Sequence, residues 1–147
     1  MQPRNPEYAE ITRRILEEAP FIRALGVEVA GIAPGRVETL LPVAPWHTQH
    51  DGYVHAGVQA TLADHTAGAA ASTLMAADEM VLTAEFKLNL LRLGQGERLL
   101  CVGSVLKPGR RLTVAEAEVH GETGGERLLI AKATVTLVLL SRARGTQ

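Results

Sequence analysis

The feature that most restricts the fold of this chain is a long alanine-rich stretch over residues 55–77, which no proline interrupts. Alanine has the highest helix propensity and adds little bulk, so this stretch predicts one long helix that other elements can approach closely. Gly57 and Gly68 lie within it and keep its surface small. We expect such a helix at the centre of the fold, with a sheet wrapped around it.

Strand-like segments flank the predicted helix on both sides. A first helix is expected over residues 5–18, with Pro6 at a position where no amide hydrogen is needed. Short turns between consecutive strands predict antiparallel pairing. The expected fold class is α+β, one long antiparallel sheet around a central helix, in a single domain, 1–147. Glycine and proline turn signals separate six predicted strands, at residues 25–33, 36–43, 80–92, 97–107, 111–120 and 127–140.

Composition limits the class of protein. A chain of 147 residues can bury a core of its own without disulfides or metals. Hydrophobic residues make up 46% and charged residues 21%, which is ordinary for a folded domain and argues against extensive disorder. The formal net charge is −1, and no lysine or arginine cluster is long enough to serve as a nucleic-acid footprint. We therefore expect no nucleic-acid partner.

The sequence also bears on the compartment. Its N-terminus is polar and contains Pro3 and Pro6, so it lacks the apolar core of a secretory signal. No segment reaches the roughly 18 to 20 apolar residues that span a bilayer. We expect a cytoplasmic protein without a membrane partner. The single cysteine, Cys101, lies in an apolar alternating run and is expected to be a buried packing thiol.

Chemistry-bearing side chains gather in the polar loop at residues 44–54 and in the helix that it opens into. The neighbours of Asp64 on the predicted helix are small and mostly apolar. A carboxylate in such surroundings indicates a functional role. The alternative is an ordinary exposed helix residue. Gln49 is the amide side chain of the loop, and it can equally be an ordinary loop residue.

Three residues of the same loop, His47, His50 and Asp51, raise the question of a metal. No second cluster completes a ligand set at a recognisable spacing. We therefore expect no bound metal.

The run Gly-Tyr-Val-His-Ala-Gly at residues 52–57, with Asp64 nine positions after His55, resembles the hotdog-fold thioesterases of the phenylacetate-degradation type. Their hallmark is a polar amide residue, a glycine, a His-Gly-Gly and an acidic residue nine positions after the histidine. The resemblance covers about residues 19–140 and implies an acyl-CoA thioesterase for a small aromatic or medium-chain acyl group. Two positions depart from the pattern. Ala56 replaces the first glycine, and Gln49 replaces asparagine, as in the hydroxybenzoyl-CoA thioesterases of the same fold.

The resemblance also implies roles. The site would be built across a dimer, with Asp64 of one subunit facing Gln49 and Ala56 of the other. Asp64 would attack the thioester or activate water, while the Ala56 N–H, at the helix start, would polarise the thioester oxygen. Gln49 would orient water or substrate, and Thr83 would help to hold water. His55 is either a proton-transfer group or a structural residue. No cofactor is expected, since coenzyme A is part of the substrate.

The only basic turn contains Lys107, Arg110 and Arg111. In the resembled family the corresponding turn lies near the coenzyme A nucleotide, and guanidinium groups suit phosphate oxygens. A plain solvated turn is an equal alternative. The family also implies a homodimer as the minimal unit and a tetramer as the expected assembly.

Two other functions stay open at the level of sequence. His50 and Asp64 are fourteen positions apart, the separation of histidine and acid in hotdog fatty-acid dehydratases, so the chain could act on an enoyl thioester as a dehydratase or hydratase. The prolines of that loop are absent. The second is a non-catalytic acyl-CoA-binding protein.

Overall fold

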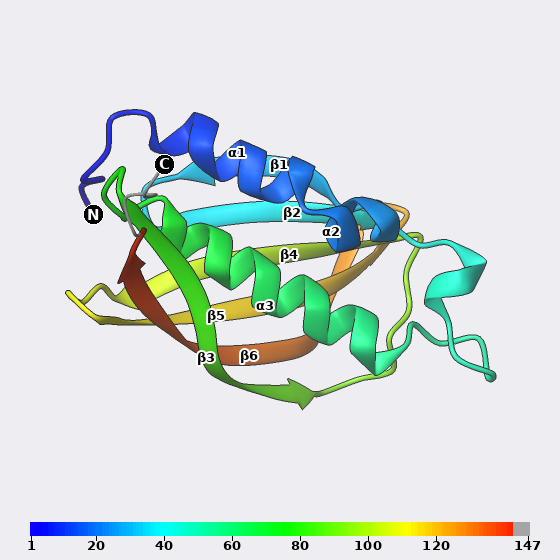
Figure 1. The fold of residues 1–147 in the computed structure, drawn as a ribbon. Helices are drawn as coiled ribbons and strands as arrows, with labels where there is room; N and C mark the ends of the chain where they lie inside the picture. Colours follow the sequence, from blue (N-terminus) through cyan, green and yellow to red (C-terminus); the bar gives the residue numbers. More distant parts are fainter. Residues whose placement is uncertain (143–147) are drawn as a thin grey trace.

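A six-stranded antiparallel sheet curves around one long helix, α3 (Ala56–Ser72), as Figure 1 shows. This confirms the predicted α+β fold class. The computed structural model describes residues 1–142, so the last residues of the predicted domain, 1–147, lie outside the described part. The strands are β1 (Glu28–Ala33), β2 (Arg36–Pro42), β3 (Glu79–Leu90), β4 (Arg98–Lys107), β5 (Leu112–Thr123) and β6 (Glu126–Ser141).

Element boundaries differ from the prediction in three places. The expected helix at 5–18 begins only at Tyr8, two residues after Pro6. The expected strand at 25–33 begins only at Glu28, because Pro20–Leu25 forms a short helix, α2, that ends at Gly26 with a φ of 82°. A left-handed residue after a helix is a common role of glycine. The expected helix at 55–77 ends at Ser72. There the buried Thr73 hydroxyl accepts a hydrogen bond from Gly35 N–H at 2.7 Å.

The order of strands in the sheet is β1-β2-β4-β5-β6-β3. The predicted pairing of consecutive strands is correct for β1 with β2, for β4 with β5 and for β5 with β6. It is wrong for β3 and β4, because β3 pairs with β6 at one edge of the sheet. The link after β3 does not turn back on itself: its Gly94 carbonyl accepts from Val54 N–H at 2.7 Å, and Glu97 bonds to Val43 and Glu122.

The core lies between α3 and the concave face of the sheet. Gly103 of β4 brings the sheet backbone against the helix, since a Cβ there would lie 2.5 Å from the Thr66 carbonyl oxygen. Thr66 and Thr39 share a buried hydroxyl hydrogen bond of 2.7 Å. Cys101 is fully buried beside them, and burial raises its pKa to about 12, which confirms the predicted packing thiol.

The N-terminal helix α1 (Tyr8–Glu18) lies beside α3 and next to β1, at one edge of the sheet (Figure 1). Leu16 of α1 is buried, and the Thr12 hydroxyl bonds to the Ser72 hydroxyl at 3.0 Å. Among residues 1–142, no helix has the length and apolar character needed to cross a membrane.

Candidate functional site

Asp64 and Thr83 meet between the middle of α3 and strand β3. Thr83 Oγ1 donates a hydrogen bond of 2.8 Å to Asp64 Oδ1. A bulge between Thr83 and Glu85 interrupts the regular alternation of the strand at this point. Asp64 is partly buried and is therefore not an ordinary exposed helix residue. The structure brings these two predicted site residues together.

Two hollows of about 340 Å³ each adjoin this pair, and Asp64 and His65 line both of them. The first lies between α1, α3 and β3. The second lies between α2, the earlier part of α3 and Phe86 of β3. The carboxylate thus has open space on both sides.

The start of α3 leaves one backbone amide free. His55 is the N-cap, and its Nδ1 accepts from Gly57 N–H at 2.9 Å. The His55 carbonyl oxygen accepts from Val58 and Gln59. Within the described residues, Ala56 N–H has no hydrogen-bond acceptor, and Ala56 is exposed. An unpaired amide at the positive end of a helix can polarise a carbonyl oxygen. The His55 ring thus caps the helix. The contact between His55 and the preceding loop is made by the backbone, where His55 N–H donates to His47 O at 2.9 Å.

Gln49 closes the tight turn that precedes α3. Its N–H donates to Tyr53 O at 2.8 Å, and its side-chain Oε1 accepts from Asp51 N–H. Gln49 and Ala56 line a common hollow of about 540 Å³, which Leu90 of β3 also borders. Asp64 does not line this hollow. Within one chain, the carboxylate and the predicted amide groups therefore occupy separate hollows.

A lock of three residues, Val54, Gln59 and Gly94, fixes the start of α3. Gln59 is buried, and its Nε2 donates to Val54 O at 3.1 Å. A Cβ on Gly94 would lie 2.5 Å from Gln59 Nε2 and 2.9 Å from Val54 O, so only glycine fits there. No local pattern predicts this contact, and Gln59, a long amide side chain among small residues at the start of the helix, is its one signal in the sequence.

His65 is a second residue that the sequence analysis missed. Its Nε2 is buried without a hydrogen-bond partner among the described residues. Burial lowers the pKa of His65, while the neighbouring Asp64 charge and a hydrogen bond to the Ile15 backbone partly oppose this. A neutral imidazole therefore lies beside the Asp64 carboxylate, on the side that faces α1.

The other loop histidines stay apart from Asp64. His47 is buried, with Nδ1 accepting from Ala44 N–H and Nε2 against Leu25 O, both at 2.9 Å. Since both ring nitrogens are occupied, His47 is a structural residue. His50 is exposed, and its Nε2 lies 3.2 Å from Asp51 Oδ2. The histidine and acid of the dehydratase reading do not meet within one chain.

The basic turn of Lys107, Arg110 and Arg111 is exposed between β4 and β5. Figure 1 places this turn at the end of the sheet that also carries the N-terminus and the end of β6, opposite the start of α3. The ten residues of β4 span about 33 Å at a strand's rise per residue. Within one chain, the turn therefore lies far from Ala56, and its contact with a nucleotide stays a prediction.

Comparison with known proteins identifies consistent relatives. A family model described as the thioesterase superfamily matches residues 51–128. The 1,4-dihydroxy-2-naphthoyl-CoA hydrolase of Listeria monocytogenes is 29% identical, over 77% of this chain and 91% of that protein. The medium/long-chain acyl-CoA thioesterase YigI of Escherichia coli is 31% identical, over 82% of this chain and 85% of that protein.

Solved structures agree with these sequence matches. A thioesterase family protein from Silicibacter pomeroyi superposes with a TM-score of 0.87 at 40% identity, covering 91% of this chain and 98% of that one. Zebra fish thioesterase superfamily member 2 gives a TM-score of 0.75 at 27% identity, over 91% and 97%.

Proposed function

This chain is a hotdog-fold thioester hydrolase that belongs to the thioesterase superfamily, and we propose that it cleaves acyl-CoA thioesters to free acid and coenzyme A. The observation that carries the proposal is the Asp64 carboxylate, held by Thr83 at 2.8 Å between two hollows. The Listeria and Escherichia coli relatives are both named for CoA thioesters, which supports this leaving group. Their names differ in the acyl part, aromatic in one and medium to long in the other.

Strand β3 supports a dimer as the working unit. In the described structure it pairs only with β6, so its second edge is free. Leu82, Phe86 and Leu90 of this strand are 49%, 41% and 51% exposed. A long edge strand with exposed apolar side chains is open to pairing with another chain. We infer that a second copy pairs with β3 in antiparallel fashion.

Such a dimer would join the two kinds of hollow. If the two-fold axis passes near Phe86 and Lys87, Thr83 of one copy lies opposite Leu90 of the other. Leu90 borders the hollow that contains Gln49 and Ala56. Asp64 of one copy would then approach the Ala56 amide of the other. This register supports the proposed site across the dimer. It would bring together the carboxylate and the amide donor, which lie in separate hollows within one chain.

In the proposed reaction, the thioester oxygen accepts a hydrogen bond from Ala56 N–H. Removal of one such donor typically costs about 3 to 4 kcal/mol of barrier. Asp64 either attacks the carbonyl carbon or takes a proton from the attacking water, and the coenzyme A thiolate leaves. Water supplies the oxygen of the acid and the proton of the thiol. Thr83 occupies one carboxylate oxygen and leaves Oδ2 for the substrate side. Gln49 would orient the water or the thioester.

Lys107, Arg110 and Arg111 are proposed to bind the nucleotide phosphates from a copy other than the one that supplies Ala56. Replacing all three by alanine should raise the KM for acyl-CoA several-fold while leaving an acyl-pantetheine substrate unaffected. An equal effect on both substrates would contradict this role. The tetramer and the cytoplasmic location stay predictions alongside it.

Thiol release from a panel of aromatic and aliphatic acyl-CoAs tests the proposed function. Asp64→Asn should remove turnover, whereas Asp78→Asn, an exposed aspartate outside the site, serves as the matched control. Turnover that survives in a folded Asp64→Asn protein contradicts the mechanism. Hydration of an enoyl-CoA without thiol release would favour the dehydratase, and tight binding without product would favour a binding protein.

A further inference from the structure

The first hollow continues from Asp64 along α3 as a trough. Asp64, Gly68 and Ser72 are four residues apart, so they follow one face of the helix. Leu82 of β3 and Leu137 of β6 form one wall, and Ile15 of α1 forms the other. The trough therefore begins at the carboxylate and runs between apolar side chains.

Along the floor of the trough, which α3 forms, only Asp64 and its neighbour His65 have polar groups that need a further hydrogen-bond partner. The Ser72 hydroxyl donates to Ala69 O at 2.8 Å and bonds to Thr12 Oγ1 at 3.0 Å. Its hydrogen-bonding groups are thus already occupied. A hydrocarbon chain can therefore lie against Ser72 without leaving the serine hydroxyl unpaired.

The length and volume of the trough agree with each other. From Asp64 to Ser72, the last residue of α3, the helix rises by roughly 12 Å. An extended chain advances about 1.2 Å per bond, so this length takes about ten carbon atoms. The volume is about 340 Å³. At about 30 Å³ for each water-sized group, it holds about eleven such groups. One aromatic ring would fill only the part next to Asp64.

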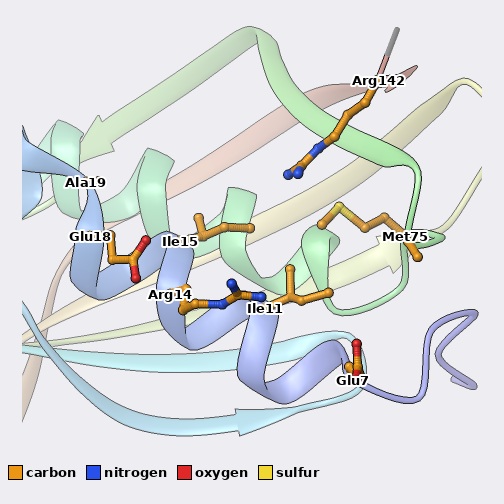
Figure 2. A pocket seen from close by; sticks show the side chains of 9 residues that line it. Glu7, Ile11, Arg14, Ile15, Glu18, Ala19, Met75 and Arg142 are labelled. Carbon is orange, nitrogen blue, oxygen red and sulfur yellow. The ribbon is translucent and has the colours of Figure 1, made fainter. Parts of the chain in front are cut away.

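The far end of the trough is charged. Met75 and Arg142 also line a neighbouring hollow of about 570 Å³, and Glu7, just before α1, borders it at the same end. Figure 2 shows Met75 and Arg142 on one side of this hollow and Ile11 and Ile15 of α1 on the other. An apolar chain gains nothing by extending past Met75 into this charged rim. The rim therefore sets an upper limit on chain length.

Gly68, in the middle of the trough, has no backbone reason to be glycine. Its φ is not positive, and a Cβ there would meet only Leu137 Cδ2, at 3.9 Å. Glycine within a helix is less stable than alanine. The absence of a side chain leaves the middle of the trough open, and this accounts for a residue that helix stability disfavours.

We propose that the trough holds the straight acyl chain of a medium-chain acyl-CoA of about eight to twelve carbons, and that Gly68 determines this length by keeping the middle of the trough open. The inference rests on the proposed function and narrows its substrate class. It favours an aliphatic chain over a small aromatic group.

Thiol release from saturated acyl-CoAs of increasing length, with benzoyl-CoA and phenylacetyl-CoA beside them, tests the proposal. The natural protein should gain about fourfold in kcat/KM for each added methylene until the trough is full. Gly68→Leu fills the middle of the trough. Its optimum should move to about four to six carbons, with kcat/KM for decanoyl-CoA lowered on the order of 100-fold and that for butyryl-CoA nearly unchanged.

Two further variants separate specificity from folding. Gly68→Ala should be at least as resistant to heat as the natural protein, and its length profile should move in the same direction as that of Gly68→Leu, but by only about one carbon. Met75→Ala, at the far end, should lengthen the preferred chain by one or two carbons. An unchanged profile in Gly68→Leu, an equal loss at every length, or a natural preference for the aromatic substrates overturns the inference. Absence of thiol release from every substrate would instead overturn the proposed function.

Discussion

The two halves of the candidate site are held in different ways. The start of α3, with its free Ala56 amide, is tied down by its own chain through the Val54–Gly94 hydrogen bond, the buried Gln59 and the His55 cap. The Asp64 carboxylate depends on one hydrogen bond from Thr83, on an edge strand that is exposed along most of its length. The donor half is therefore formed within one chain, whereas in the proposed dimer a second copy would enclose the carboxylate half.

The largest expected effect comes from removing the carboxylate and then restoring it from another copy. Asp64→Asn should lower kcat by at least about 1,000-fold, as loss of a general base or nucleophile typically does. Gly94→Ala disrupts the donor half instead. If each site takes one half from each copy, an equal mixture of the two variants, refolded together, should recover about a quarter of natural activity, because half of the dimers contain one intact site.

This recovery distinguishes a shared site from one that lies within a single chain. Mixing cannot rebuild an intact site if both halves come from the same copy. Activity no higher than the sum of the two variants alone, in a sample shown to have exchanged subunits, would therefore contradict the shared site. Asp78→Asn mixed with Gly94→Ala gives the matched reference.

Gly94→Ala alone should lower kcat by about 100-fold, since a displacement of about 1 Å in a catalytic group can cost that much. The added Cβ would lie 2.5 Å from Gln59 Nε2 and force the start of α3 to move. Steady-state kinetics with a thermal-denaturation control measures this effect. Gln95→Ala, at the exposed next position, should leave kcat unchanged. A normal kcat in folded Gly94→Ala would mean that the lock does not position the amide.

Thr83→Val keeps the shape of the side chain and removes the hydrogen bond to Asp64. A hydrogen bond to a charged group contributes about 1.5 to 3 kcal/mol, so kcat should fall by at least about tenfold. Thr83→Ser retains the hydroxyl and should keep most of the activity. Equal losses in the valine and serine variants would point to packing of the methyl group, not to the hydrogen bond.

Some parts of the structure can be predicted from the sequence, and others cannot. The central helix and most strand limits follow from local patterns of small and alternating apolar residues. The position of β3 does not, because the short link after it looks like a hairpin, whereas it passes the start of α3 and joins two strands that are not neighbours in the sheet. Asp64 stood out as a carboxylate among small side chains. The Gln59–Gly94 contact joins residues that are far apart in the sequence, and no local pattern reveals it.

The smallest expected effect concerns His65, which lies beside Asp64 in the carboxylate half. Burial lowers its folded-state pKa below the ordinary value of 6.5. As the pH falls below 6.5, the unfolded chain therefore binds a proton first, and the free energy of unfolding decreases. We expect a lower urea midpoint at pH 5.5 than at pH 7.5. His65→Phe should reduce this difference, whereas His50→Gln, at an exposed position, should not.

Other titrating groups do not mask the effect of His65 between pH 5.5 and pH 7.5. The carboxylates whose pKa is lowered by an arginine or lysine partner, Glu79, Glu118 and Glu122, lose their stabilising charge only in more acidic solution. An unchanged pH difference in His65→Phe would mean that another group accounts for the loss of stability. A reduced difference would identify a buried neutral imidazole beside Asp64, which makes the carboxylate half of the site sensitive to acid.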